Sequence, residues 1–381
     1  MLKELKRYTI SPRREIKEFL TTVSLHELAQ AAINIFEPIY LYTQHLTVVQ
    51  IILFYLGVYV LYFLLIPFGG RVAKAFGFEH TMSLGIIFTI AYFLSLIAIP
   101  AAPEFLYLSI ILYALQKTFW WPAYHANFAR YSRSREAGRE IGATYVISSL
   151  TAAVGPLIGG ALITYTNFAV LYTVAIVLIL ISVFPMLSTP ERFTPSQHSW
   201  LTQMRYIFAR KRLRRLVMGL GFGEELIALT IWPLFLFLLV KSALDLGALV
   251  AIATTVTVLA TTVAARWSDD RSRRTVYLWG GVLNVLSWIG RPLLIWPLAA
   301  LGIDTVYRTG KSLLYVPMYS RVYQDAKNSH VMLEVVSFEA SLILGKIVTM
   351  LVLLIVFPLA GFSGAFVLAA VASLFYFLFR N

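Results

Sequence analysis

Residues 36–42 read Phe-Glu-Pro-Ile-Tyr-Leu-Tyr, and residues 231–237, 195 positions later, read Ile-Trp-Pro-Leu-Phe-Leu-Phe, so an aromatic and aliphatic pattern recurs around a proline. Without a gap, the same offset aligns three further pairs of identical residues in distant parts of the chain. These pairs are Arg71 with Arg266, Pro122 with Pro317 and Tyr124 with Tyr319. Four matches at one offset indicate an internal repeat. The chain is therefore predicted to consist of two structurally related halves.

The composition of this 381-residue chain is far more apolar than that of a soluble protein. Hydrophobic residues make up 59% and charged residues 13%, and the mean hydropathy is +0.75. Soluble domains have about 45–50% apolar and about 25% charged residues. The predicted fold is an all-α membrane protein with twelve transmembrane helices in two pseudo-symmetric six-helix bundles. The expected spans are Phe19–Tyr42, Val48–Phe68, Thr81–Pro100, Phe105–Tyr124, Ile141–Thr164, Val170–Leu187, Leu216–Val240, Leu246–Ala265, Val276–Trp296, Leu298–Tyr319, Val335–Phe357 and Ala365–Phe379.

The basic residues are distributed unevenly between the loops. Of the 32 Lys and Arg, 26 lie before the first span, after even-numbered spans or at the chain end, whereas Lys241 lies in a loop on the other side. Because cytoplasmic loops are enriched in Lys and Arg, both termini are predicted to be cytoplasmic. Topology thereby accounts for the net charge of +13, and no nucleic-acid partner is expected. We expect a monomeric, multi-pass protein in the lipid bilayer of a plasma membrane of the bacterial inner-membrane type.

The halves are predicted to be residues 1–187 and 216–381, joined by a cytoplasmic basic linker at 188–215. The linker carries turn-forming Thr-Pro pairs and then the basic, amphipathic stretch 200–215, which is expected to lie along the membrane surface. It either joins the halves as a solvated segment or has a regulatory or lipid-binding role.

This six-plus-six layout resembles the major facilitator superfamily, whose hallmark in the loops after spans two and eight is Gly-x-x-x-Asp-Arg-x-Gly-Arg-Arg. Residues 265–274, Ala-Arg-Trp-Ser-Asp-Asp-Arg-Ser-Arg-Arg, retain the acidic residue and the basic pair. Residues 70–77, Gly-Arg-Val-Ala-Lys-Ala-Phe-Gly, retain both glycines but have Lys74 at the acidic position. The resemblance implies a secondary transporter with a cavity between its halves.

Residues 155–160, Gly-Pro-Leu-Ile-Gly-Gly, are similar to the core of a motif that is frequent in family members exporting substrate in exchange for protons. Small residues permit close helix approach, which ordinary tight packing would also use. The residues expected to act in gating are Gly70, Arg71, Asp269, Arg273, Arg274, Gly155 and Pro156.

Polar residues fall on spans one, four, seven and ten, the set that lines the central cavity in the resembling family. Charged residues at membrane depth normally face a cavity or one another. In the first span they follow helical spacing and share one face. The expected cavity residues are His26, Gln30, Asn34, Glu37, Tyr113, Gln116, Lys117, Trp120, Trp121, Asp304, Arg308, Lys311 and Tyr315.

Two acid–base pairs are predicted at similar depth from the cytoplasmic ends of the spans. Glu27 matches Lys117 in the first half, and Glu224 or Glu225 matches Lys311 in the second. The three glutamates are the candidates for proton coupling. Alternatively, the pairs are closed ion pairs that keep the bundle in register.

The positions of four residues within the expected spans carry further information. Glu339 and Lys346 share a face of the eleventh span and would meet the fifth span or the cavity edge. Arg291 lies in the outer third of the ninth span, where its guanidinium could reach the membrane surface. His26 is the single imidazole within the expected spans, so neither a metal nor a cofactor is expected.

The sequence favours proton-coupled export of organic amphiphilic molecules by alternating access. Uptake of a sugar, peptide or organic anion is the second possibility, and a non-transporting sensor or lipid scramblase on the same scaffold is a third. The chain lacks a Walker loop and the second histidine of a metalloprotease helix, so an enzyme is not expected.

Overall fold

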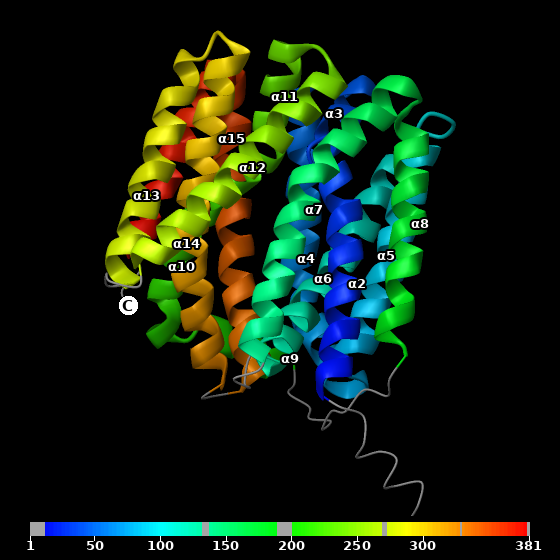
Figure 1. Ribbon diagram of the computed structural model, residues 1–381, viewed down its shortest axis with the longest axis vertical. Coiled ribbons are helices and arrows are strands. Elements are labelled where there is room, and N and C mark those ends of the chain that lie inside the picture. The colour runs from blue at the N-terminus through cyan, green and yellow to red at the C-terminus, as the bar shows by residue number, and fades with distance from the viewer. Residues whose placement is uncertain (1–11, 132–136, 189–199, 269–272, 328–329, 379–381) are drawn as a thin grey trace, which may run out of the picture.

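A computed structural model of the chain describes residues 12–131, 137–188, 200–268, 273–327 and 330–378 (Figure 1). The described residues form helices in two groups that lie side by side. The N-terminal half contains α2 (Pro12–Ile33), α3 (Glu37–Thr43), α4 (Val48–Phe76), α5 (Phe78–Ala98), α6 (Phe105–Tyr131), α7 (Ala137–Tyr165) and α8 (Phe168–Met186). The C-terminal half contains α10 (Leu213–Gly219), η2 (Leu220–Phe222), α11 (Gly223–Val240), α12 (Ala243–Ser268), α13 (Arg273–Gly290), η3 (Arg291–Leu293), α14 (Pro297–Lys327), α15 (Val331–Ser373) and η4 (Leu374–Leu378).

A short helical segment lies between the halves in sequence, comprising α9 (Trp200–Ile207) and η1 (Arg210–Arg212). Helix α9 contacts both α4 and α15, so it bridges the halves at one end of the bundle (Figure 1). We call this end the α9 end and the opposite end the α3 end.

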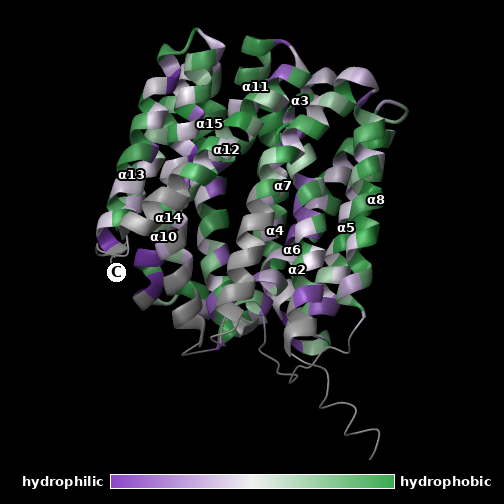
Figure 2. Ribbon diagram, in the orientation of Figure 1, coloured by the Kyte–Doolittle hydropathy of each residue, from purple (hydrophilic) through white to green (hydrophobic). Residues whose placement is uncertain are grey.

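Several described segments are long and apolar enough to cross a membrane. By length and composition these are Val48–Phe76, Phe78–Ala98, Phe168–Met186, Leu213–Val240 and Val331–Leu378. Figure 2 shows hydrophobic residues along the outer helix α8, where Phe184 is 74% exposed. In contrast, the charged residues Glu224, Asp304 and Arg291 are almost fully buried. Apolar residues outside and charged residues inside are the arrangement of a multi-pass membrane protein.

The expected first and seventh spans are both interrupted. The first is divided between Ile33 and Glu37, where Pro38 in the first turn of α3 allows a new helix to begin. The seventh contains the 3₁₀ turn η2 between α10 and α11. Hydropathy predicts apolar length but carries no signal for a change of helical geometry within it.

The last spans join differently from the expectation. The expected ninth span ends as an α-helix at Gly290 and continues as η3, since Pro292 cannot supply a backbone N–H. The eleventh and twelfth are merged in α15, with a sharp change of direction at Gly361, whose φ of 54° favours glycine.

The halves contact each other near both ends of the bundle. Toward the α3 end, α3 contacts α11 and α7 contacts α12. Toward the α9 end, α4 packs against α15, where Gly70 lies against Val336. Glycines make the α7 contact possible, because a Cβ at Gly160 would overlap the Ala243 carbonyl oxygen.

Gly159→Ala and Gly247→Ala are expected to lower the Tm of the purified protein. The new methyl groups would overlap the carbonyl oxygens of Ala32 and Pro156, and overpacking of this kind costs about 1–3 kcal/mol. Gly302→Ala is the matched control, since nothing lies within 4 Å of its Cβ position. Thermal unfolding in detergent measures the effect, and equal Tm values for all three variants would contradict the close packing.

Candidate functional site

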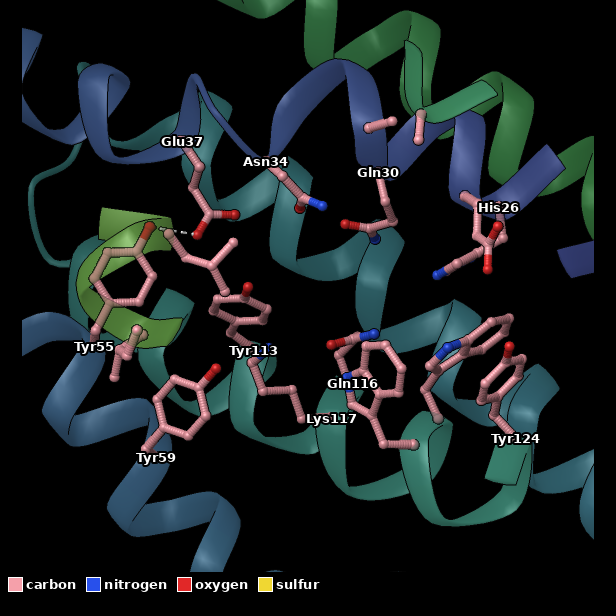
Figure 3. Close-up of a pocket in the computed structure, with 17 residues that line it drawn as sticks. His26, Gln30, Asn34, Glu37, Tyr55, Tyr59, Tyr113, Gln116, Lys117 and Tyr124 are labelled. Atoms are coloured by element: carbon pink, nitrogen blue, oxygen red, sulfur yellow. Dashed lines mark hydrogen bonds between the residues drawn. The ribbon is translucent and has the colours of Figure 1, made fainter. Parts of the chain in front are cut away.

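An internal cavity of about 300 Å³ lies mainly within the N-terminal half. Its lining comes mostly from α2, α3, α4, α6 and α7, while Leu226 and Leu229 of α11 contribute from the other half. Figure 3 shows the polar side chains of α2 and α3 facing those of α4 and α6 across it. The lining residues are His26, Glu27, Gln30, Ala31, Asn34, Glu37, Tyr55, Tyr59, Tyr113, Gln116, Lys117, Trp120, Trp121, Tyr124, Ala152, Leu226 and Leu229.

The first-half cavity residues expected from the sequence all lie in this lining. Tyr124, which shares the face of the fourth span with Tyr113 and Lys117, also lines it, whereas the sequence analysis did not include Tyr55 and Tyr59. Tyr55 and Tyr59 belong to α4, which the repeat argument had not assigned to the cavity. Their spacing of four on one helix face was the available signal.

One end of the cavity is aromatic. The rings of His26 and Trp120 are stacked at 3.8 Å between centroids, with an interplanar angle of 18°. Trp120 is in turn parallel to Tyr124 at 6.3 Å. Such a stack presents flat apolar surface to a bound molecule.

The cavity also contains a cation and carboxylates. The Lys117 ammonium lies 4.2 Å from the ring centroid of Tyr113 and 5.3 Å from that of Tyr59. Glu37 accepts a hydrogen bond of 2.7 Å from the Tyr55 hydroxyl (Figure 3). Glu27 lines the same cavity as Lys117, and the ion pair between them stays a prediction. Acid, base and aromatic surface together suit an amphiphilic ligand.

The C-terminal half contains a buried ion pair between Glu224 and Lys311. Glu224 is fully buried and accepts hydrogen bonds from Lys311 at 2.6 Å, Trp288 at 2.9 Å and Tyr376 at 3.0 Å. Of the two glutamates predicted to match Lys311, Glu224 is therefore the one in contact with it. Lys311 does not line the cavity.

Glu225 has a different partner from the one predicted. Its carboxylate accepts hydrogen bonds from Tyr315 at 2.6 Å and pairs with Lys346 of α15 at 2.9 Å. The Lys346 ammonium also lies 5.2 Å from the centroid of Tyr59 in α4. Lys346 thus links the second half to the cavity wall of the first, rather than meeting the fifth span. The tenth-span residue Tyr315 is engaged here and lies outside the cavity lining.

Asp304 and Arg308 also lie outside the cavity lining, in a cluster of the second half. Asp304 pairs with Arg308 at 2.6 Å and accepts a hydrogen bond of 2.9 Å from Trp232. The position of Arg291 contradicts the expectation that it reaches the surface, because it is completely buried. Its guanidinium lies 3.6 Å from the Trp288 ring centroid and 3.8 Å from Asp304. The turn η3 directs the side chain inward, which the extrapolated helix could not indicate.

The gating candidates fall into three groups. Asp269 lies outside the described residues, as does the side chain of Arg273, while Arg71 and Arg274 are exposed. Gly155 and Pro156 lie in α7, where Gly155 packs against Ala31 of α2 and the Pro156 carbonyl lies against Gly247 of α12, at positions only small residues can occupy. Their role in gating stays a prediction.

The linker is bound to the second half through Glu334 at the start of α15. Glu334 receives two hydrogen bonds from Arg212, at 2.6 and 2.8 Å, and further bonds from Arg215 and Tyr206. Partial burial disfavours the charged form of Arg212, but Glu334 and Tyr206 outweigh it and raise the pKa of Arg212. The basic stretch is thus tied to the bundle by ion pairs of Arg212 and Arg215 with Glu334.

A histidine that the sequence analysis left outside the spans lies at the contact between the halves. Helix α6 continues to Tyr131, beyond the expected span end at Tyr124, so His125 is buried within the bundle. Its Nε2 lies 3.1 Å from Glu339 of α15. His26 is therefore not the single imidazole inside the protein, although no group of three or more His, Asp or Glu suited to a metal occurs among the described residues.

Helices with apolar outer faces around a polar, aromatic cavity define a multi-pass membrane protein that can hold a small molecule in its interior. The chain belongs to the Major Facilitator Superfamily, whose sequence model matches residues 19–243. It is also similar to the Multidrug resistance protein MdtH of Photorhabdus laumondii, with 26% identity over 218 residues, which are 56% of this chain and 54% of that protein. The chain thus spans about half the length of the curated relative it matches.

Proposed function

We propose that this protein is a secondary active transporter that exports organic amphiphilic molecules in exchange for protons. The observation that carries the proposal is the cavity itself, which combines the His26–Trp120 stack with Lys117 and the carboxylates Glu27 and Glu37. The name of the relative, a multidrug resistance protein, supports export and a broad organic substrate class.

The proposed architecture has twelve spans in two six-helix bundles, residues 1–187 and 216–381, with both termini in the cytoplasm. The α9 end is then the cytoplasmic end, because the basic linker lies there. The protein would reside in the plasma membrane as a monomer and work by alternating access, as one half rocks against the other. In this cycle, the contacts between the halves near the two ends of the bundle would open alternately.

Transport into proteoliposomes tests the proposal. A planar aromatic cation such as ethidium, a neutral amphiphile and an aromatic carboxylate are compared with and without an imposed pH gradient. Accumulation of the cation or the neutral compound that requires the gradient is expected. Equal distribution of all three compounds under every gradient would contradict secondary active export.

Uptake of an organic anion is a second candidate, which Lys117 favours. Its ammonium lies over the rings of Tyr113 and Tyr59 at the cavity wall, where it is well placed to bind a carboxylate. Accumulation of the aromatic carboxylate alone, in the direction of inward proton movement, would select this function. Arg308 and Lys311 no longer support it, since both are paired with acids of their own half.

A further inference from the structure

Helix α9 lies across the junction of α4 and α15 at the α9 end (Figure 1). Its buried face carries Gln203 and Ile207, which are one helical turn apart. A Cβ on Gly70 of α4 would lie 3.2 Å from the side-chain oxygen of Gln203 and 2.8 Å from Val336 of α15. Gln203 therefore reaches into the contact between the two halves.

The outer face of α4 shows the depth at which α9 lies in the membrane. Val48–Phe76 is long and apolar enough to cross a bilayer. At helical spacing on one face of this helix, the exposed residues are Val60, Leu64, Phe68 and Arg71. Apolar side chains on such a face contact lipid tails, and a basic side chain at the end of the same face reaches the headgroups. Because Arg71 directly follows Gly70, α9 lies at the level of the headgroups.

The outer face of α9 continues the lipid-facing surface of α4. The ring of Phe208, directly after α9, lies 6.4 Å from that of Phe63 in α4, with an interplanar angle of 71°. Phe208 is 51% exposed despite this contact, and Leu64, the neighbour of Phe63, is 53% exposed. One and two turns before Phe208 on the same face, Arg205 and Leu201 are also exposed. The apolar surface of α4 thus extends to α9 and meets a guanidinium there.

The arginines of the linker fall into two groups. Arg212 and Arg215 are paired with Glu334 and hold the segment against α15. Arg205 and Arg210 are exposed, and neither is paired with a carboxylate of the described residues. A guanidinium can bind phosphate oxygens through two parallel hydrogen bonds, and basic residues at a membrane surface attract anionic lipids. Charge complementarity therefore favours an anionic occupant for this largely apolar surface.

We propose that the surface formed by Leu201, Arg205, Phe208 and Arg210, together with Leu64 of α4, binds an anionic phospholipid of the surrounding membrane. Arg205 and Arg210 bind the phosphate, and an acyl chain follows Phe208 and Leu64 along the outer face of α4. A soluble anion lacks the acyl chain and a neutral lipid lacks the net charge, so neither matches both parts of the surface. Neither the transported substrate nor proton coupling enters into this lipid site.

Quenching by brominated lipids measures which lipid occupies the surface. Since the chain contains no cysteine, Val60→Cys provides a single position for a bimane fluorophore, one turn from Leu64 on the exposed face of α4. Leu180→Cys provides a reference position, because Leu180 is exposed on the outer helix α8, away from the linker surface. Each labelled protein is reconstituted in phosphatidylcholine bilayers that contain equal amounts of brominated phosphatidylglycerol or brominated phosphatidylcholine. The ratio of the two quenching efficiencies gives the relative affinity of the two lipids.

We expect phosphatidylglycerol to be preferred at the Val60 label by at least about fivefold, which is the contribution of about one arginine near anionic headgroups. At the Leu180 label, both lipids should quench equally. Salt should reduce the preference at Val60, because at about 1 M the Debye length falls to about 3 Å.

Variants of the two exposed arginines test the recognition of the headgroup. Arg205→Gln with Arg210→Gln should abolish the preference at Val60, because both guanidiniums are lost. Lys17→Gln with Arg274→Gln is the matched control, since it removes the same charge from exposed positions outside the linker and should retain the preference. Arg205→Lys with Arg210→Lys retains the charge without the paired hydrogen bonds, so part of the preference should remain. The Tm should stay close to that of the wild type in each variant, because the replaced side chains are exposed.

Four outcomes would overturn the lipid site. These are equal quenching by both lipids at Val60, the same preference at Leu180, a preference that survives Arg205→Gln with Arg210→Gln, and its loss in the matched control. Competition by soluble glycerol phosphate as strong as that by the lipid would assign the surface to a free anion instead. A normal lipid preference in a protein that fails to transport would overturn the proposed function alone.

Discussion

Glu27→Gln is expected to abolish substrate accumulation driven by a pH gradient, while substrate binding and the exchange of substrate for substrate persist. Glu27 lies in the cavity wall with Lys117, the Gln side chain has the same shape, and it cannot carry a proton. Burial disfavours a charged carboxylate and a nearby ammonium favours it, so a change in their separation would couple protonation to conformation. Counterflow and gradient-driven uptake in the same proteoliposomes distinguish the two activities.

Glu37→Gln is the matched control for this variant. Glu37 is a second cavity carboxylate, but it already accepts a hydrogen bond from Tyr55, which a glutamine oxygen can also accept. We expect this variant to retain most of the gradient-driven accumulation. If Glu27→Gln still concentrates substrate while Glu37→Gln does not, the coupling carboxylate is Glu37.

The second large effect is expected for Glu224→Ala, which should strongly destabilise the C-terminal half. The Lys311 ammonium would remain buried without its carboxylate, and removal of one partner of a buried ion pair costs about 3–5 kcal/mol. Trp288 and Tyr376 would lose an acceptor as well. The Tm of the purified protein should fall further than in any glycine variant.

The double variant Glu224→Leu with Lys311→Met shows whether this pair has more than a structural role. Apolar residues of similar volume often replace a buried pair without loss of stability. Recovery of the Tm together with transport would make the pair purely structural. Recovery of the Tm without transport would show that the charges take part in the transport cycle, and an unaltered Tm in Glu224→Ala would contradict its burial as an ion pair.

The sequence predicted that Glu224 or Glu225 pairs with Lys311, because depth along two spans is readable from residue counts, and the structure shows that Glu224 is the partner. It could not predict that Lys346 pairs with Glu225, since spacing defines a face of one helix but not which helix lies opposite. The sequence analysis did not place His125 inside the protein, because the expected span ends at Tyr124, where apolar character declines. The helix itself continues to Tyr131. The inward direction of Arg291 depends on a 3₁₀ turn that hydropathy does not encode.

The positions of the helices were also predictable from the sequence, whereas the interruptions within them were not. Each expected apolar span coincides with described helix over most of its length, because membrane insertion requires long apolar segments. The interruptions before Glu37 and Gly223 were not predicted. They arise from local backbone geometry, and they bring Glu37 into the cavity and Glu224 to the closed ion pair.

Helix α15 joins three distant parts of the molecule through one uninterrupted stretch. Glu334 binds the linker, Glu339 binds the first half, and Lys346 lies against Tyr59 of the cavity wall. No non-helical residue occurs before Gly361, so these contacts move together. An environment-sensitive fluorophore at Trp200 of the adjoining α9 should therefore change its emission when a ligand fills the cavity. The protein would then serve as an optical sensor of its own substrate.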